Sequence, residues 1–144
     1  MSHRLLFMTD WAVALLSLAG LCISTYFTAI AFRWIDPSAR YLPGFCRMGE
    51  KTCAAVVFTP RARLFGVPNS VLGQAYYVCL LAGVAAGRLW ADWFWPALVV
   101  SLLTVVVGIY LTYSLLFWTK ISCKLCFTSH GINAVIFVLL AVGR

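Results

Sequence analysis

Four long apolar runs, separated by polar stretches, dominate the chain. We expect helices over residues 11–32, 70–87, 96–117 and 123–143, joined by a long connection over residues 33–69 and by two short turns. The first run would extend about 33 Å as an α-helix, which is enough to cross the hydrocarbon core of a bilayer. The runs lack the strict alternation of barrel strands, so helices must satisfy their backbone hydrogen bonds. The pattern predicts an all-α membrane protein.

The tryptophans support this division into spans. All six lie at or just beyond the ends of the runs, where an interfacial aromatic belt places them. They are Trp11, Trp34, Trp90, Trp93, Trp95 and Trp118. We therefore expect one membrane domain over residues 1–144 with four spans. Because the number of spans is even, the long connection and the turn before the last span must lie on the same face of the membrane.

Composition agrees with a membrane protein and limits the partners. Hydrophobic residues make up 63% of the chain and charged residues only 10%. The formal net charge is +7, but the basic residues lie between the apolar runs and no nucleic-acid-binding module is visible. Anionic lipid headgroups of the bilayer, or an acidic protein, are better candidate partners than nucleic acid.

Four of the six cysteines fall on the shared face. Cys46 and Cys53 lie in the long connection, whereas Cys123 and Cys126 begin the last apolar run. The other two, Cys22 and Cys79, fall inside predicted spans and are interpreted as small hydrophobic residues.

A polar stripe continues from the second cysteine pair into the last span. In a continuous helix, Cys123, Cys126, His130 and Asn133 would fall within an arc of roughly 80°. Such residues are costly inside a membrane helix unless they serve a function. The stripe therefore indicates a functional site near one end of this span.

Two cysteine pairs at one membrane face suit either thiol–disulfide exchange or a tetrahedral zinc site. One pair on a long loop and one at a helix N-terminus favour exchange, because one pair can move against the other. Lys120 and Lys124 would favour the thiolate of Cys123. A soft-metal-ion membrane carrier or a structural thiolate–metal site is the alternative, and a scaffold with a static disulfide is a third possibility. We assign no metal ligand.

Electrons taken from thiols need an acceptor. The sequence shows no haem motif, no dinucleotide-binding glycine pattern and no acidic residue inside a predicted span. A membrane quinone, of the ubiquinone or menaquinone class, is the simplest acceptor. His130, one turn below Cys126, and Asn69, at the start of the second span, could donate hydrogen bonds to its oxygens. Tyr110 and Tyr113 could form a wall of its pocket.

These residues resemble the vitamin K epoxide reductase family of membrane quinone reductases. The matching pieces cover the chain from about Cys46 onward, in order. They are Cys46 and Cys53, Phe-Gly-Val-Pro-Asn-Ser-Val-Leu-Gly over residues 65–73 with Tyr76 and Tyr77, and the run from Tyr110 through Cys123-Lys-Leu-Cys126 to Asn133. The resemblance implies a four-helix transmembrane bundle around a quinone, with the long loop capping the quinone pocket.

The resemblance also implies roles for the cysteines. Cys123 and Cys126 would form the active-site disulfide, with Cys126 facing the quinone. Cys53 would exchange with Cys123, and Cys46 would meet the partner protein. The expected enzyme is a thiol:quinone oxidoreductase that generates disulfides.

Two departures from the family refine this expectation. The animal enzymes that reduce vitamin K carry a tyrosine at the position of His130, so we expect quinone reduction and leave action on the epoxide open. Many bacterial relatives carry a fused thioredoxin-like domain, and we expect none here. We therefore expect a separate thioredoxin-like thiol oxidase as partner.

Charge and compartment give opposite indications of orientation in the plasma membrane. The positive-inside rule counts Lys and Arg. Eight lie on the cysteine face (Arg33, Arg40, Arg47, Lys51, Arg61, Arg63, Lys120, Lys124) and three on the opposite face (Arg4, Arg88, Arg144). This count favours a cytosolic cysteine face, whereas disulfide formation belongs outside the cytosol. We expect an extracytoplasmic (periplasmic) cysteine face, with the inverted orientation as the alternative.

Overall fold

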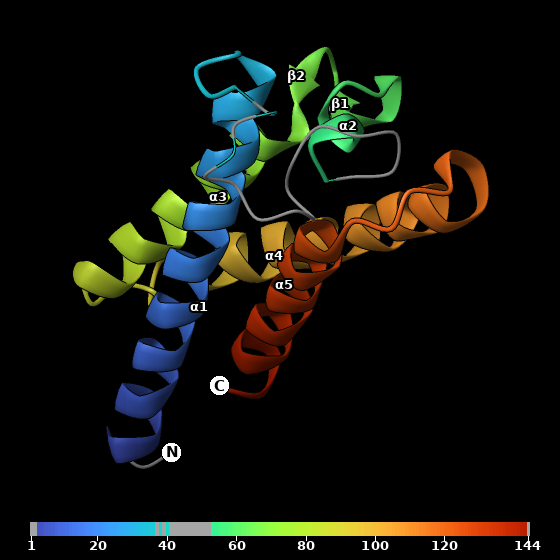
Figure 1. The fold of residues 1–144 in the computed structure, drawn as a ribbon. Helices are drawn as coiled ribbons and strands as arrows, with labels where there is room; N and C mark the ends of the chain where they lie inside the picture. The colour runs from blue at the N-terminus through green and yellow to red at the C-terminus, as the bar shows by residue number, and fades with distance from the viewer. Residues whose placement is uncertain (1–2, 37, 39, 41–52, 144) are drawn as a thin grey trace.

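The computed structural model describes residues 3–36, 38, 40 and 53–143, and for Cys53 and Ala54 it describes the backbone only. Helices dominate this part of the chain (Figure 1). The elements in order are α1 (His3–Ala31), α2 (Cys53–Val57), the 3₁₀ helix η2 (Pro60–Ala62), β1 (Arg63–Leu64), β2 (Val67–Pro68), α3 (Asn69–Ala85), α4 (Phe94–Tyr113), the π-helix η3 (Ser114–Thr119) and α5 (Lys124–Val142).

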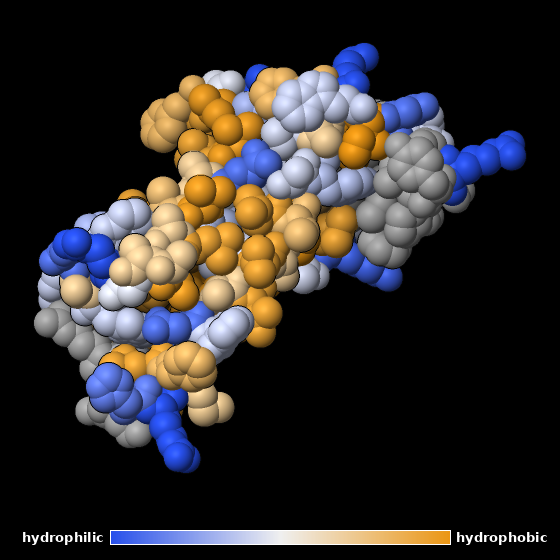
Figure 2. Space-filling view, turned by 90° about the vertical axis from the view of Figure 1, so that its left-hand side faces the viewer, coloured by the Kyte–Doolittle hydropathy of each residue, from blue (hydrophilic) through white to orange (hydrophobic). Residues whose placement is uncertain are grey.

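Three helical segments of the described chain are long and apolar enough to cross a membrane: α1, α4 with η3 (Phe94–Thr119), and α5. The second predicted span is helical but shorter, because α3 has 17 residues and extends only about 26 Å. A broad hydrophobic area crosses the middle of the face shown in Figure 2, and hydrophilic residues gather mainly toward its two ends. The expected helical membrane protein is thus confirmed in class.

The structure corrects several predicted boundaries. Helix α1 begins at His3 rather than at residue 11, since residues 3–10 contain neither glycine nor proline to interrupt it. The third span continues past residue 117 as the π-helix η3.

The all-α expectation also missed a small antiparallel hairpin, in which β1 pairs with β2. Its turn residues, Phe65 and Gly66, both have positive φ (53° and 81°), the conformation that a two-residue type I′ turn needs.

The helices pack in pairs, and a cavity separates α3 from α4 in the middle of the molecule. Helix α1 contacts α3 and α5, and α4 contacts α5. The core includes Val13, Tyr77, Leu80, Ile136 and Leu140. A large cavity lies between α3 and α4 and is lined by both of these helices.

The described part of the long connection, residues 53–68, lies at the same end of the molecule as the turn before α5, as the even number of predicted spans requires. In Figure 1 the start of α1 and the end of α5 lie toward the bottom, whereas α2, β1 and β2 lie at the top. Helix α2 contacts α5 and α1 directly. This end carries the cysteine pair of α5.

Candidate active site

Cys123 and Cys126 form a disulfide at the start of α5, with their Cα atoms 5.2 Å apart. Cys123 is the N-cap residue in an extended conformation (φ −99°, ψ 99°), and its Sγ accepts the N–H of Cys126 at 3.2 Å. The expectation that Cys123 belongs to the helical stripe is therefore wrong in detail. Cys126, His130 and Asn133 share the helix face, and Cys123 approaches it from the preceding turn.

The two sulfurs have different surroundings. Cys123 is fully buried (0% exposed) in an apolar cluster with Phe27, Leu115 and Ile121. Residues 55–57 of α2 pack against this cluster, so α2 is part of the apolar surroundings of Cys123. Cys126 lies at the edge of the cluster and lines the large cavity. A ligand in the cavity can therefore reach Cys126, whereas protein covers Cys123.

The other predicted cysteine pair lies at the edge of the description. Cys53 is the first residue of α2, and its side chain is not described. Cys46 lies outside the described residues. Because α2 packs beside Cys123, the backbone of Cys53 is on the same end of the molecule as the disulfide.

The cavity has a volume of about 870 Å³, within the usual range for small-molecule sites, roughly 300–1,000 Å³. Helices α3 and α4 form its sides, and α5 and the segment from α2 to β1 complete the wall. Most of its lining is apolar. The polar side chains on its wall include Arg61, Asn69, Ser114, Ser129, His130 and Asn133. This combination suits a flat, mainly apolar ligand with a few polar atoms.

His130 lies between this cavity and a smaller pocket of about 340 Å³ formed by α4 and α5. Its Nδ1 is buried and, among the described residues, has no hydrogen-bond partner. The imidazole rests against Gly108, where a Cβ would stand 3.0 Å from Nδ1. The ring is thereby fixed against α4.

The structure brings Asn69 to the cavity but not Tyr110. Asn69 is the first residue of α3, directly after the N-cap residue Pro68, and it lines the cavity. The side chains of Tyr110 and Tyr113 are 53% and 52% exposed. Tyr113 lines the smaller pocket beside His130, and Tyr110 lines neither.

The rotation of α4 explains the placement of both tyrosines. Gly108 and Leu111 occupy the inward face of α4. A residue two positions further along is about 200° around the helix. Helical spacing alone does not reveal which face of α4 is turned inward, so the predicted aromatic wall is not where it was expected.

Tyr76 and Tyr77 do line the cavity, although the sequence alone assigned them no role there. The hydroxyl of Tyr77 donates to Asn133 Oδ1 at 2.6 Å, and Tyr76 and Ser101 share a hydrogen bond of 2.7 Å between their hydroxyls. Both tyrosines line the cavity and join α3 to the helices on its other side. The adjacent tyrosines inside an apolar run were the available signal, because a buried phenol needs a partner.

The sequence model of the Vitamin K epoxide reductase family matches residues 11–141. The chain belongs to this family. The match extends from α1 to the last turn of α5 and so includes the disulfide and the whole cavity. Members of the vitamin K epoxide reductase family are membrane thiol–quinone oxidoreductases that work with a redox partner.

The residues on the cavity wall fit a quinone. A quinone accepts two electrons and two protons when bound. Its ring needs an apolar slot with hydrogen-bond donors for its oxygens. The wall offers a half of the disulfide at Cys126, an imidazole at His130 and a carboxamide at Asn69. Among the residues that the structure describes, no group of three or more His, Cys, Asp or Glu side chains could hold a metal ion.

Proposed function

We propose that this member of the vitamin K epoxide reductase family oxidises the thiols of a separate thioredoxin-like protein and delivers the electrons to a membrane quinone of the ubiquinone or menaquinone class. The observation that carries the proposal is the position of Cys126. It is one half of a disulfide and also part of the wall of a mainly apolar cavity, which His130 and Asn69 line as well.

The proposed path uses both cysteine pairs. The partner's dithiol reduces a Cys46–Cys53 disulfide and leaves as a disulfide. The thiolate of Cys53 then attacks Cys123, so that a Cys53–Cys123 bond forms and Cys126 leaves as a thiolate. Attack by Cys46 on Cys53 releases Cys123 as a thiol. Re-forming the Cys123–Cys126 disulfide gives two electrons and two protons to the quinone, which becomes the hydroquinone.

The residues around Cys126 have separate roles in this proposal. His130 donates from Nε2 to one quinone oxygen, and Asn69 donates to the other from the start of α3. Asn133 does not need to bind the ligand through its carbonyl, because Tyr77 already occupies Oδ1. The hydrogen bond from Tyr77 instead fixes the wall beside Cys126.

The membrane arrangement is part of the same proposal. Helix α3 also spans the membrane, which brings the number of spans to four, since 17 residues lie at the lower limit for crossing a bilayer. The segment from α2 to β1 caps the pocket. We place the protein in the plasma membrane with the cysteine end outside the cytosol. After treatment with a reductant that opens the Cys46–Cys53 disulfide, a membrane-impermeant thiol reagent should label Cys46 in intact cells; labelling only after the cells are broken would establish the inverted orientation.

A comparison of two reductants tests the path. Cys46→Ala should abolish quinone reduction driven by reduced thioredoxin and leave reduction driven by dithiothreitol nearly unchanged, because a small dithiol can attack the Cys123–Cys126 disulfide directly. Hydroquinone formation by the purified protein in lipid nanodiscs is the measurement. Equal loss with both reductants would contradict the proposed division between Cys46 and the inner pair.

A further inference from the structure

Arg61 makes two contacts across the rim of the cavity, both with η3. Its Nη1 donates to Ser114 Oγ at 3.0 Å, and its Cζ lies 3.7 Å from the centroid of the Trp118 ring. Ser114 is almost fully buried and begins η3, and Trp118 lies near the other end of η3. Among the described residues, Arg61 forms no ion pair with a carboxylate.

The segment that carries Arg61 is continuous with α2. Backbone hydrogen bonds join Phe58 to Ala55, Thr59 to Val56, and Ala62 to Thr59. The hydroxyl of Thr59 also donates to the carbonyl of Val56 at 2.7 Å. The chain from Cys53 to Ala62 is therefore one hydrogen-bonded unit, so the position of Arg61 is coupled to the position of α2.

The other side of the contact leads directly to the active disulfide. Lys120 follows η3 in a left-handed conformation (φ 53°), and the N–H of Ile121 returns to the carbonyl of Leu115 at 3.1 Å. Leu115 and Ile121 pack with Cys123 and with residues 55–57 of α2. A π-helix is rare and is frequently found at functional sites. Here the π-helix η3 carries both residues that Arg61 contacts, Ser114 at its start and Trp118 near its end, shortly before Cys123.

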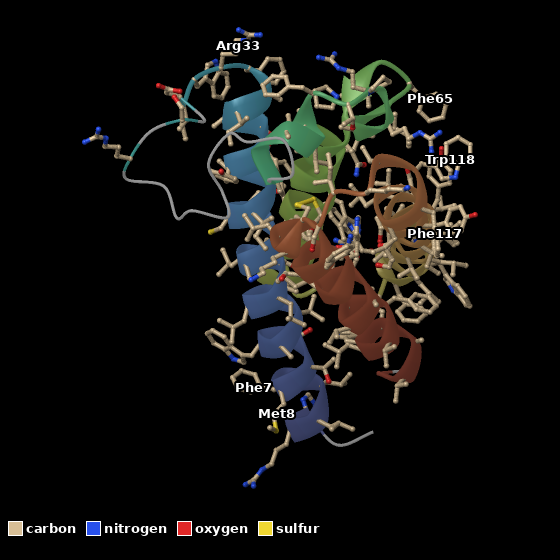
Figure 3. The ribbon with its side chains drawn as sticks, turned by 45° about the vertical axis from the view of Figure 1, so that its right-hand side comes forward. Phe7, Met8, Arg33, Phe65, Phe117 and Trp118 are labelled. Atoms are coloured by element: carbon tan, nitrogen blue, oxygen red, sulfur yellow. A yellow bond between two sulfur atoms is a disulfide. The ribbon has the colours of Figure 1, made fainter. Side chains whose placement is uncertain are left out.

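We propose that Arg61 is a positioning residue, which holds the unit that begins with Cys53 in register with Cys123 for thiol–disulfide exchange. The inference rests on the proposed function. Figure 3 shows Trp118 and Phe65 on the same outer side of the molecule, so the contact lies beside the hairpin, remote from the α1 side. On that opposite side, Arg33 lies over the ring of Phe58, with its Cζ 5.8 Å from the centroid. Arg33 and Arg61 thus contact the segment from Cys53 to Ala62 and its neighbours on two opposite sides. Arg61 joins this segment to η3, which directly precedes the turn that carries Cys123.

The direct test measures the effective concentration of the Cys53 thiol at the Cys123 thiol. In a protein in which Cys22, Cys46, Cys79 and Cys126 are all replaced by alanine, the remaining Cys53 and Cys123 thiols form one disulfide as glutathione disulfide is reduced to two glutathione thiols. The equilibrium yield in glutathione buffers gives the effective concentration of one thiol at the other. Arg61→Gln should lower it about 5- to 30-fold, because the variant loses a charged hydrogen bond and a cation–π contact. Trp118→Leu should lower it about 2- to 5-fold, since the hydrogen bond to Ser114 remains.

Arg63→Gln is the matched control. Arg63 lies two residues further on and is exposed, and its guanidinium donates a hydrogen bond to the carbonyl of Gly66 in the hairpin turn. It should leave the effective concentration within twofold of the parent value. An unchanged value in Arg61→Gln, or an equal fall in Arg63→Gln, would overturn the inference.

Quinone reduction separates this inference from the proposed function. With the native cysteines, Arg61→Gln should lower kcat by a larger factor for the reaction driven by reduced thioredoxin than for the reaction driven by dithiothreitol, which does not use the Cys53–Cys123 exchange. An equal fall with both reductants would place Arg61 on the quinone side and overturn a role in positioning. If the unsubstituted protein reduced no quinone with dithiothreitol, the proposed function would fail, while the disulfide equilibrium would still report on Arg61.

Discussion

Gly108 and His130 lie against each other at the boundary between α4 and α5, with so little space that a Cβ on Gly108 would stand 3.0 Å from His130 Nδ1. Gly108 therefore sets the position of the imidazole. Gly108→Ala should push the ring toward the cavity and slow quinone reduction by about 5- to 50-fold, as a displacement of about 1 Å can cost catalysis roughly 100-fold. Hydroquinone formation with dithiothreitol is the measurement.

Gly131 provides a matched control for this substitution. It is next to His130 in α5, but a Cβ there would meet nothing within 4 Å. Gly131→Ala should leave turnover unchanged and should not lower stability, since alanine favours a helix by about 1 kcal/mol over glycine. A similar loss in both alanine variants would show that the effect of Gly108→Ala is not steric contact with His130.

His130 itself should matter as a donor. His130→Phe removes the ring nitrogens from a mainly apolar wall and should cost about 1 to 3 kcal/mol in the transition state, roughly 5- to 150-fold in rate. His130→Tyr should preserve much of the activity, because a phenol can also donate there. Steady-state quinone reduction compares the two variants. Equal turnover in Phe and Tyr variants would make His130 a packing residue.

The packing of α1 on α3 gives a prediction on stability. A Cβ at Gly20 would overlap the ring of Tyr77, which is buried and bonded to Asn133, so the ring cannot move away freely. Gly20→Ala should destabilise the protein by about 1 to 3 kcal/mol, measured as a lower temperature of thermal unfolding in detergent. Gly73→Ala is the control, because its Cβ would lie 3.6 Å from Ser24 Cβ, an ordinary contact. Equal unfolding temperatures would contradict this packing.

The sequence was sufficient for the helical membrane class and for the shared helix face of Cys126 and His130, because apolar run length and helical spacing are local properties. It did not predict that Cys123 leaves the helix as its N-cap, because helix boundaries depend on turn geometry, here a left-handed Lys120 after a π-helix. The roles of Tyr110 and Tyr113 were misplaced because the rotation of α4 depends on its contact with α5. The contacts of Gly108 and Arg61 join segments distant in sequence, and spacing alone does not predict such contacts.

The most direct measurement is hydroquinone formation from a membrane quinone and dithiothreitol by the purified protein in lipid nanodiscs, compared for Cys126→Ala, Cys123→Ala and Cys22→Ala. Cys22 is a free, exposed cysteine on α1 outside the cavity, and its variant should turn over like the unsubstituted protein. The variants of Cys123 and Cys126 should insert and fold but lose at least about 1,000-fold in rate, as expected when a covalent participant is removed. Turnover near that of the unsubstituted protein in Cys126→Ala would contradict electron transfer from this disulfide to the quinone.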